Sequence, residues 1–547
     1  MRKNSPASPP AAPAQIFCGG HVLQSGFHAA PEWTQAVAVH EGRIVAAGPE
    51  ARVRRGLRAL ELACETVDLA GGYLIPGFMD AHMHPLFGAV FQDDGLKLVD
   101  AGGMFLNDPG AVAEAVARAQ FQPAGKNDWL VGYGWNPELA QHGEFNRALL
   151  DAVAPHWPVY LLSLDAHFAL VNSAGWKRLQ PLRYPAGSGE VPLDTRGQPR
   201  GLLLETPQFI ASLQVLAQMP YERVARAFER FQQAALTAGL TTIADIITDP
   251  GVLGIYQRLL GENRLRLRLF ASPYGPLDCH AAMAEQLRAA DLDATRLALG
   301  PEKYLLDGTP GNHNAAWFQV YADNPSTSGY LTLSPDALTA AVERAHREKR
   351  DLALHAAGDL SVHYALDAIE FGALRHWGQH GDGPLPARIR IEHFDNVTAV
   401  DRGRLSGLAR LGLLASVQPT HFHKVYLRVI EKVLGPERMK NEYPLATLAR
   451  AGIPVALNSD WPAAMTFAPL EIMAAALAHG AESLDAAGAL AGYHHWSALA
   501  LRAEAWLGRI APGCAADFVL LNGDPLKQPP EQLHIQKLWI NGNQQAV

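Results

Sequence analysis

The residues best suited to chemistry are two histidines that stand one residue apart at the end of an apolar segment. His82 and His84 belong to the run Pro76–Pro85. In an extended strand alternate side chains point to one face, so both imidazoles can reach the same ion while Met83 points away. Such pairs are common, so this pair alone leaves open a metal site and two ordinary histidines.

Four more residues of metal-binding type stand at or just after the ends of later apolar segments: Lys303, His355, His393 and Asp460. The carboxyl ends of barrel strands converge on one face, where barrel active sites lie. Core packing can explain one such histidine, but not matching positions on separate segments. Imidazole and carboxylate donors suit zinc, with manganese, iron, cobalt or nickel as alternatives. We therefore predict a divalent metal site with zinc as the first candidate.

Short apolar segments and helical patterns alternate through the middle of the chain, and these elements must position the candidate ligands. A helix is predicted from Ser334-Pro335, where serine caps the helix and proline opens its first turn. Eight strand–helix repeats predict an α/β fold, a (β/α)8 TIM barrel with a parallel sheet. The candidate strands are 74–79, 241–245, 265–271, 303–307, 352–355, 389–393, 413–418 and 455–460.

The barrel is expected to occupy residues 73–504, with one interruption. Residues 86–240 separate the first two strands, far more than the usual βα loop of about 2–6 residues. They contain strand patterns of their own at 129–133 and 159–162. We predict that this segment is an inserted subdomain over the active-site face.

Both ends of the chain are rich in strand patterns. Near the start, two short apolar runs are joined by Glu41-Gly42, a hairpin signal because glycine accepts the positive φ of a tight turn. Residues 15–72 and 505–547 are therefore predicted to form one small β-sandwich domain, since chain ends often lie close together. Residues 1–14 are rich in proline and alanine and are predicted to be a disordered tail.

Composition excludes several classes of protein. The 547 residues include 46 basic and 54 acidic side chains, a net charge of −8, and no basic stripe that would favour nucleic acid. The four cysteines are far apart, which indicates a reducing compartment. The N-terminus has no apolar run of the signal-peptide kind, and no segment has the ~20 apolar residues of a membrane span. We expect a cytoplasmic protein with a small-molecule substrate, and a homodimer by base rate alone.

The order of candidate ligands resembles the amidohydrolase superfamily: His-x-His after the first strand, Lys after the fourth, His after the fifth and sixth, and Asp after the eighth. Nearly the whole chain after the tail is similar to amidohydrolase family 3, in its formamide deformylase-like branch. The similar segments are Pro76–Pro85, Asp165–His167, Val171–Ser173, Gly201–Glu205, His355–Asp359, Arg390–His393, Ser416–Pro419, Asn458–Asp460 and Gly508–Asp517.

The resemblance implies a centre of one or two ions, with two favoured. His82, His84 and Asp460 would hold the first ion, and His355 and His393 would hold the second. A protonated lysine repels a cation, so Lys303 can serve only if it is neutral or carbamylated. The alternative is a structural Lys303 paired with a carboxylate such as Asp307. The implied ligands are His82, His84, Lys303, His355, His393 and Asp460.

The implied reaction is hydrolysis of a C–N bond other than a peptide bond, in a small amide, N-acyl or formamide-type substrate. Water acidified by metal would attack, and Asp460 would take its proton and pass it to the leaving nitrogen. The predicted catalytic residues are Asp460, Lys303 and His167. Two alternatives stay open: a mononuclear aminohydrolase (deaminase), and a non-catalytic scaffold of the same fold.

Substrate contacts are expected from the insertion and from strand ends. His167 is expected to reach the pocket with Asn172 orienting it, although a core histidine beside an Asn-capped turn is an alternative. Asp359 is either a partner of a metal-bound imidazole or a residue that starts a helix. The loop Thr309–His313 and the pair His494-His495 depart from the family pattern, so specificity does not carry over. The expected substrate-binding residues are Trp135, His167, Asn172, Glu205 and Gln418.

Overall fold

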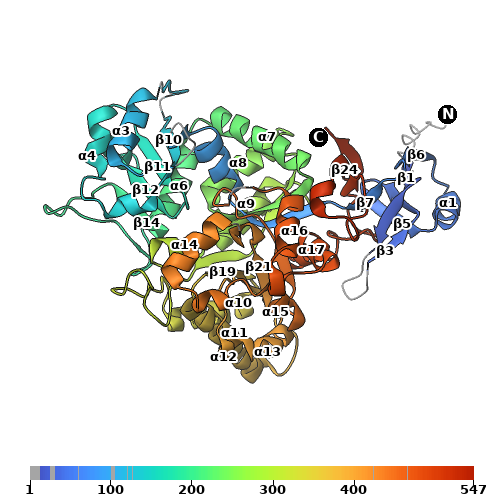
Figure 1. Cartoon of the computed structure of the whole chain (residues 1–547). Coiled ribbons are helices and arrows are strands. Elements are labelled where there is room, and N and C mark those ends of the chain that lie inside the picture. The colour runs from blue at the N-terminus through green and yellow to red at the C-terminus, as the bar shows by residue number, and fades with distance from the viewer. Residues whose placement is uncertain are drawn as a thin grey trace.

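Two parallel sheets lie at the centre of the computed structural model (Figure 1). The structure describes residues 13–24, 31–59, 61–99, 105–119, 121–125, 127–422, 424–464 and 466–546. The predicted tail lies outside these residues up to position 12, and Ala14 is already the first residue of strand β1.

The central strands are almost completely buried, as expected for parallel sheets covered on both faces. The first sheet has the order β17-β16-β15-β8 and the second β18-β19-β20-β21-β22. Their bounds are β8 (Phe78–Met83), β15 (Leu240–Thr248), β16 (Arg268–Pro273), β17 (Leu297–Leu299), β18 (Glu302–Leu305), β19 (Leu352–Ala356), β20 (Ile389–His393), β21 (Leu414–Val417) and β22 (Val455–Leu457).

The two sheets meet at both of their edges. A parallel bridge joins Tyr274, after β16, to Lys303 in β18. At the other edge, Asp460 N donates to His82 O at 2.9 Å, and His84 N donates to the carbonyl of Trp461 at 2.7 Å. All strands therefore end on one common side, as an α/β barrel pattern requires.

The predicted first strand, 74–79, is wrong in its bounds, because this segment is divided between two sheets. Strand β7 (Tyr73–Pro76) pairs antiparallel with a strand near the C-terminus, and β8 begins at Phe78. Between them Gly77 N donates to Asp517 O at 2.9 Å. A Cβ at position 77 would lie 2.2 Å from Thr241 Oγ1, so only glycine fits this crossing. The other seven predicted segments each overlap a parallel strand.

The helix predicted from Ser334-Pro335 is confirmed. Ser334 Oγ accepts from Ala337 N at 3.3 Å, and Pro335 opens α10. The apolar residues of α10 are buried in the main hydrophobic core. The helices before, between and after the central strands are α7 (Tyr221–Thr237), α8 (Pro250–Gly261), α9 (His280–Ala290), α10 (Pro335–Glu348), α11 (Asp359–His380), α12 (Ala399–Arg402), α13 (Leu405–Arg410), α14 (Lys424–Leu434), α15 (Leu445–Arg450), α16 (Pro469–Leu477), α17 (Ala486–Tyr493) and α18 (His495–Ala500).

A six-stranded sheet of order β13-β14-β12-β11-β10-β9 lies in the chain between β8 and β15. The strand patterns predicted at 129–133 and 159–162 correspond to β10 and β11. The elements of this segment are α2 (Pro85–Phe87), β9 (Leu96–Lys97), α3 (Pro109–Arg118), β10 (Leu130–Trp135), α4 (Arg147–Val153), β11 (Val159–Ser163), β12 (Phe168–Val171), α5 (Ser173–Trp176), β13 (Gly189–Glu190), β14 (Leu202–Glu205) and α6 (Thr206–Gln218).

Strands from the two ends of the chain share one sheet, β25-β24-β23-β7-β2-β3, at the end of the molecule away from the sheet of β9–β14 (Figure 1). A second sheet, β5-β4-β1-β6, packs on it, with the rings of Phe17 and Phe518 5.3 Å apart. The predicted hairpin turn is confirmed, with φ of 49° at Glu41 and 74° at Gly42. The strands and one helix are β1 (Ala14–Cys18), β2 (His21–Gln24), β3 (Glu32–Thr34), β4 (Ala36–His40), β5 (Arg43–Gly48), α1 (Glu50–Ala59), β6 (Cys64–Asp68), β7 (Tyr73–Pro76), β23 (Phe518–Leu521), β24 (Ile535–Ile540) and β25 (Asn543–Gln545).

A buried ion pair ties the central strands to the C-terminal segment. Arg268 on β16 donates to both carboxylate oxygens of Asp517, at 2.6 and 3.0 Å, and both side chains are buried. Among the described helices, none combines the length and the apolar character that crossing a membrane requires.

Replacing Asp517 by alanine should lower the free energy of unfolding by about 3–5 kcal/mol, because it leaves the Arg268 guanidinium buried without its counter-charge. Urea unfolding at neutral pH measures the change. The exposed pair Arg118–Glu114 provides the control, since Glu114→Ala should cost less than about 1 kcal/mol. Equal losses in the two variants would contradict the structural role given to Asp517.

Candidate metal centre

The predicted ligands gather at the carboxyl ends of the central strands. They come from β8, β18, β19 and β20 and from the segment after β22. His167, from the turn between β11 and β12, reaches the same place. One cavity is lined by His82, His84, His167, Lys303, His355, His393 and Asp460, together with Asp165 and a few apolar residues.

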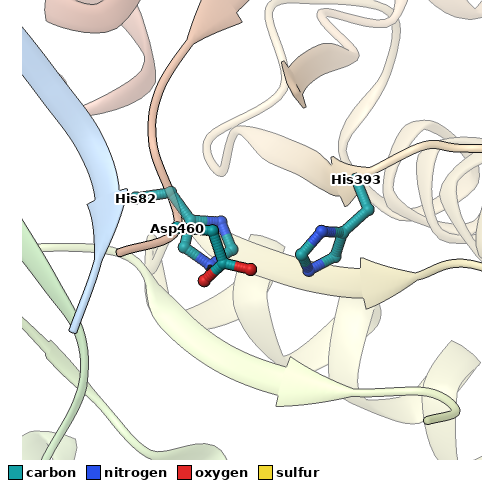
Figure 2. Close-up of side chains that lie close together, drawn as sticks. All are labelled: His82, His393 and Asp460. Carbon is teal, nitrogen blue, oxygen red and sulfur yellow. Dashed lines mark ion pairs between the residues drawn. The ribbon is translucent and has the colours of Figure 1, made fainter. Parts of the chain in front are cut away.

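One carboxylate oxygen lies between two imidazoles. Asp460 Oδ1 is 3.3 Å from His82 Nε2 and 3.3 Å from His84 Nε2. The ligand atoms of His82, His393 and Asp460 all lie within 4.8 Å of one another. Figure 2 shows these three side chains converging from separate segments.

Two of these side chains depend on an unusual backbone. His393 has φ of 69° and Asp460 has φ of 57°, values that residues other than glycine seldom adopt. Along β20, the Glu392 side chain points towards His82. If the backbone stayed extended, His393 would point to the opposite face of the strand, as Ile391 does, and so away from the cavity. Changing φ from about −120° to a positive value moves the Cβ to the other face, and the imidazole then points into the cavity.

The hydrogen-bond partners of His82 and His355 indicate which ring nitrogen of each carries the proton and which keeps a lone pair. His82 Nδ1 donates to Glu392 Oε2 at 2.5 Å, which leaves the Nε2 lone pair facing Asp460. Arg390 Nε in turn donates to Glu392 at 2.5 Å. His355 Nε2 donates to the carbonyl of Gly308 at 3.1 Å, which leaves Nδ1 as its lone-pair nitrogen. Such partners are typical of histidines that bind metal.

The charge states of the group fit a divalent cation. Burial lowers the pKa of His84 to about 4 and those of His355 and His393 well below the usual value. Burial would raise the pKa of Asp460, but His82 and its other imidazole neighbours outweigh it and hold this pKa well below its usual range. Burial and Lys303 oppose the charged form of His82, but Glu392 and Asp460 outweigh them and raise its pKa. The neutral imidazoles of His84, His355 and His393 beside an ionised carboxylate are donors that zinc and related metals prefer.

Lys303 is buried in this cavity, where Glu392 and Asp460 are the carboxylates that favour its charged form. Burial lowers the pKa of Lys303 to about 8, and no carboxylate oxygen in the described ranges lies within 4.0 Å of its ammonium. No ion pair joins Lys303 and Asp307 among the described residues, and the role of Lys303 stays a prediction. The Asp307 carboxylate accepts instead from Ala316 N, Gly358 N and Ser361 Oγ, at 2.7–2.9 Å.

The His167 imidazole is held by the carboxylate of Glu205 and not by the amide of Asn172. Its Nδ1 donates to Glu205 Oε2 at 2.7 Å, and Glu205 Oε1 accepts from Asn314 at 2.5 Å. Burial opposes the charged imidazole, but Glu205 outweighs it and raises the pKa of His167 to about 9. The expectation that Asn172 orients His167 is corrected. Asn172 caps α5 and bonds to Val159 N, at 2.8 and 3.0 Å respectively.

Two other expected substrate contacts lie away from the cavity wall. The Trp135 side chain is fully buried against Phe145, and its indole N–H donates to Leu161 O at 2.9 Å. Gln418 donates to Asn458 at 2.5 Å and lies 3.4 Å from His82 Nδ1, so it supports a ligand rather than the substrate. Glu205, as described above, holds His167.

Structural roles explain three further residues that the sequence singled out: Asp359, His494 and His495. Asp359 starts α11 and accepts from Phe318 N at 2.9 Å, which is the helix-start alternative. His494 and His495 are both buried, and His494 stacks on Phe78 at the start of β8. Because Phe78 begins the strand that ends at the ligands, this pair lies at the opposite end of the sheet and is neither a surface feature nor a wall of the pocket.

The loop Thr309–His313 joins the inserted sheet to the central strands. Asp165 accepts from Asn312 and, at 3.4 Å, from Thr309 Oγ1. Asn314, directly after the loop, donates to Glu205. The departure from the family pattern at this loop therefore coincides with the contact that holds His167 in place.

Sequence reasoning missed Glu392 and Asn314. Glu392 could have been found from alternation, because Arg390 and Glu392 alternate with Ile389 and Ile391 along the strand and must share one face. Asn314 carried no such signal, since it lies in an irregular loop and meets Glu205 only through the tertiary fold.

Comparison with known proteins agrees with this geometry. A family model described as "Amidohydrolase family" matches residues 65–545. The Bacillus subtilis (strain 168) protein YtcJ, named provisionally as an amidohydrolase, is 28% identical over 531 residues, covering 93% of this chain and 95% of that protein. The N-substituted formamide deformylase of Arthrobacter pascens is 27% identical over 536 residues, covering 93% and 94%. A solved structure of an uncharacterised metal-dependent hydrolase from Pyrococcus horikoshii OT3 has a TM-score of 0.72 at 22% identity, over 95% of this chain and all of that one.

Replacing Glu392 by glutamine should weaken zinc binding about 10–100-fold, because the carboxylate that fixes the tautomer of His82 is lost. Competition with a chromophoric chelator measures the affinity. Glu504→Gln, which alters a carboxylate paired with Arg388, should leave the affinity unchanged. Equal affinities for wild type and Glu392→Gln would remove this carboxylate from the centre.

The raised pKa of His167 predicts a pH-dependent stability. A group whose pKa rises from about 6.5 in the unfolded chain to about 9 in the fold stabilises the fold fully below pH 6.5 and loses this contribution as the pH passes through 9. Urea unfolding between pH 6 and 10 should therefore show a steeper fall in wild type than in Glu205→Gln. Glu190→Gln should keep the wild-type slope, and parallel curves for all three proteins would contradict the assignment.

Proposed function

The chain belongs to the amidohydrolase family, and from this premise we propose that it is a metal-dependent hydrolase of C–N bonds other than peptide bonds. Its proposed substrates are small amides, N-acyl amines or N-substituted formamides. The observation that supports this most directly is the approach of His82 Nε2 and His84 Nε2 to the same oxygen of Asp460, at 3.3 Å each, in a cavity that also holds His167.

The roles of the side chains follow from their charges. A bound divalent ion, for which we propose zinc, supplies Lewis-acid chemistry by acidifying water and polarising a carbonyl oxygen. Asp460 keeps one oxygen between the imidazoles, and its Oδ2 has no hydrogen-bond donor within the described part of the chain. This oxygen is placed to accept a proton from the attacking water and to return it to the leaving nitrogen.

His167 is proposed to bind the substrate's oxygen. Its Nδ1 is occupied by Glu205, so Nε2 is the nitrogen left for the substrate. With the pKa of His167 raised to about 9 by Glu205, Nε2 carries a proton at neutral pH and can donate to an oxygen on which negative charge develops. An amide or formamide carbonyl is the simplest group that meets this requirement.

The remaining predictions concern architecture and cell biology. We propose that the two parallel sheets are one eight-stranded TIM barrel in which β17 and β18 are two pieces of the fourth strand. The two sheets from the chain ends would be one β-sandwich domain, and the sheet of β9–β14 an inserted subdomain.

All four cysteines are free thiols, which supports a cytoplasmic location. A homodimer remains a prediction from base rates.

Lys303 has two proposed states. The neutral amine reacts with carbon dioxide to give a carbamate, and burial, which lowers the pKa of Lys303 to about 8, makes that form accessible. As a carbamate it would offer oxygens to a second ion beside His355 and His393. As an amine it would leave the first ion to act alone.

Asp460→Asn should lower kcat about 10²–10⁴-fold on any hydrolysed member of a library of N-substituted formamides and small N-acyl amines, because it removes the proton acceptor. Liberated amine and acid are measured separately. Chelation should abolish the wild-type activity and added zinc should restore it. The control Asp485→Asn alters the cap of α17, far from the cavity in sequence and exposed, and should keep wild-type kcat.

Release of ammonia from an aminated ring, with no amide hydrolysed, would move the function to a deaminase. A protein that takes up no metal and hydrolyses nothing would be the non-catalytic scaffold.

A further inference from the structure

We propose that His346, His376 and His380 form a binding site for one divalent transition-metal ion on the outside of the molecule, between α10 and α11. This site is separate from the cavity at the carboxyl ends of the central strands, and it goes beyond the proposed function. Nickel, copper, cobalt and zinc are the ions that a set of imidazoles suits.

The three histidines lie on two neighbouring helices, towards the end of each. His346 is in the last turn of α10, and His380 is the last residue of α11. Each helix connects two strands that pair in parallel, so it runs antiparallel to them and ends near the start of the following strand. The histidines therefore lie at the end of the central strands that is opposite to the cavity.

α11 carries a stripe of residues at intervals of four. Gly372, His376 and His380 follow one another at this interval, and side chains four residues apart lie on the same face of a helix. The His346 ring lies over the start of the stripe, since a Cβ at position 372 would be 3.7 Å from His346 Cδ2. The ring centroid of His376 is 5.6 Å from that of His346 and 4.6 Å from that of His380. The three imidazoles thus form a row with His376 in the middle.

These spacings fit ligands of one ion. Zn–N bonds of about 2.0–2.1 Å at tetrahedral angles place the centroids of two bound imidazoles about 5 Å apart. The distance from His376 to one neighbour is slightly longer than this and the distance to the other slightly shorter. His380 is exposed, so a change of its rotamer can bring a ring nitrogen to an ion held by His346 and His376.

His346 is a buried imidazole that lacks hydrogen bonds. Only 2% of its surface is exposed, and neither of its ring nitrogens has a hydrogen-bond partner within the described part of the chain. A buried imidazole normally has such partners, so the bare nitrogens cost free energy. Burial, with His376 nearby, lowers the pKa of His346 to about 4, so the ring is neutral and keeps a lone pair. A metal ion bonded to this lone pair would remove part of the cost.

The surroundings also favour a cation. The last turn of a helix carries partial negative charge from its carbonyl groups, and His346 and His380 both stand in such a turn. The two arginines next to the histidines are each paired with a glutamate, Arg375–Glu343 at 2.5 Å and Arg347–Glu348 at 3.2 Å. Their charges are therefore balanced and leave the row of imidazoles open to an ion.

Equilibrium dialysis against nickel tests the site. The proteins are wild type, His376→Gln and His380→Gln, with His534→Gln, which alters an exposed histidine elsewhere, as the matched control. Wild type and the control should bind one nickel ion per chain at least about tenfold more tightly than the other two variants, because even the loss of a ligand's hydrogen-bond partner costs about 10–100-fold.

Hydrogen exchange locates the ion. Bound nickel should slow amide exchange in peptides 340–350 and 370–381 of wild type and should leave these peptides of His376→Gln unchanged. Peptides that contain His82 and His393 report separately on the cavity and should respond alike in both proteins. His376→Gln should also keep the wild-type rate of any hydrolysis. A failure of this site and a failure of the proposed function are therefore distinguishable.

Equal nickel affinity in wild type and His376→Gln, with the same protection of both peptides, would overturn the site. The variant His346→Leu removes the ring nitrogens and keeps an apolar side chain. If it folds and binds nickel as tightly as wild type, the set of three ligands is overturned and only the pair on α11 remains. If it does not fold, the exchange of peptide 340–350 in wild type decides the part of His346, since an ion held by α11 alone would leave that peptide unprotected.

Discussion

The hydrogen bond from His82 Nδ1 to Glu392, 2.5 Å long, joins β8 of one central sheet to β20 of the other. Arg390 extends this link, because it donates to Glu392 and to the carbonyls of Ala81 and Ala500, at 2.9 and 3.1 Å. All of these groups are buried, so none of them can exchange its partner for water without a large loss of free energy. The position of His82, the first predicted ligand, is therefore fixed by the same contacts that hold the two sheets together.

The cavity is built from backbone conformations that the rest of the fold must support. Ala166, Glu205, His393 and Asp460 all have positive φ, between 57° and 69°. Each such residue costs about 1–3 kcal/mol, and such residues are found mainly where the surrounding structure compensates for the strain and a function uses it. Here each one adjoins or provides a side chain that faces the cavity. The tightly packed core around the central strands supplies the compensation.

The inserted sheet and the loop after β18 are mutually dependent. Asp165 holds Asn312 of this loop, and Asn314 holds Glu205, which in turn holds His167. A change in the loop would therefore move the side chain that we propose to contact the substrate.

The sequence by itself determined which residue types could bind a metal, the alternation of strands and helices, and the face on which these side chains meet. These follow from local patterns, since parallel strands end on one edge and HxH spacing puts both imidazoles on one side. The tertiary structure alone decided which carboxylates partner the histidines, that Asn172 and Trp135 belong to the core of the inserted sheet, and that His346 is buried without a hydrogen-bond partner among the described residues. The physical reason is range: periodicity records the neighbours of a residue within one element, whereas Glu392 and His82, 310 positions apart, meet only when the sheets pack.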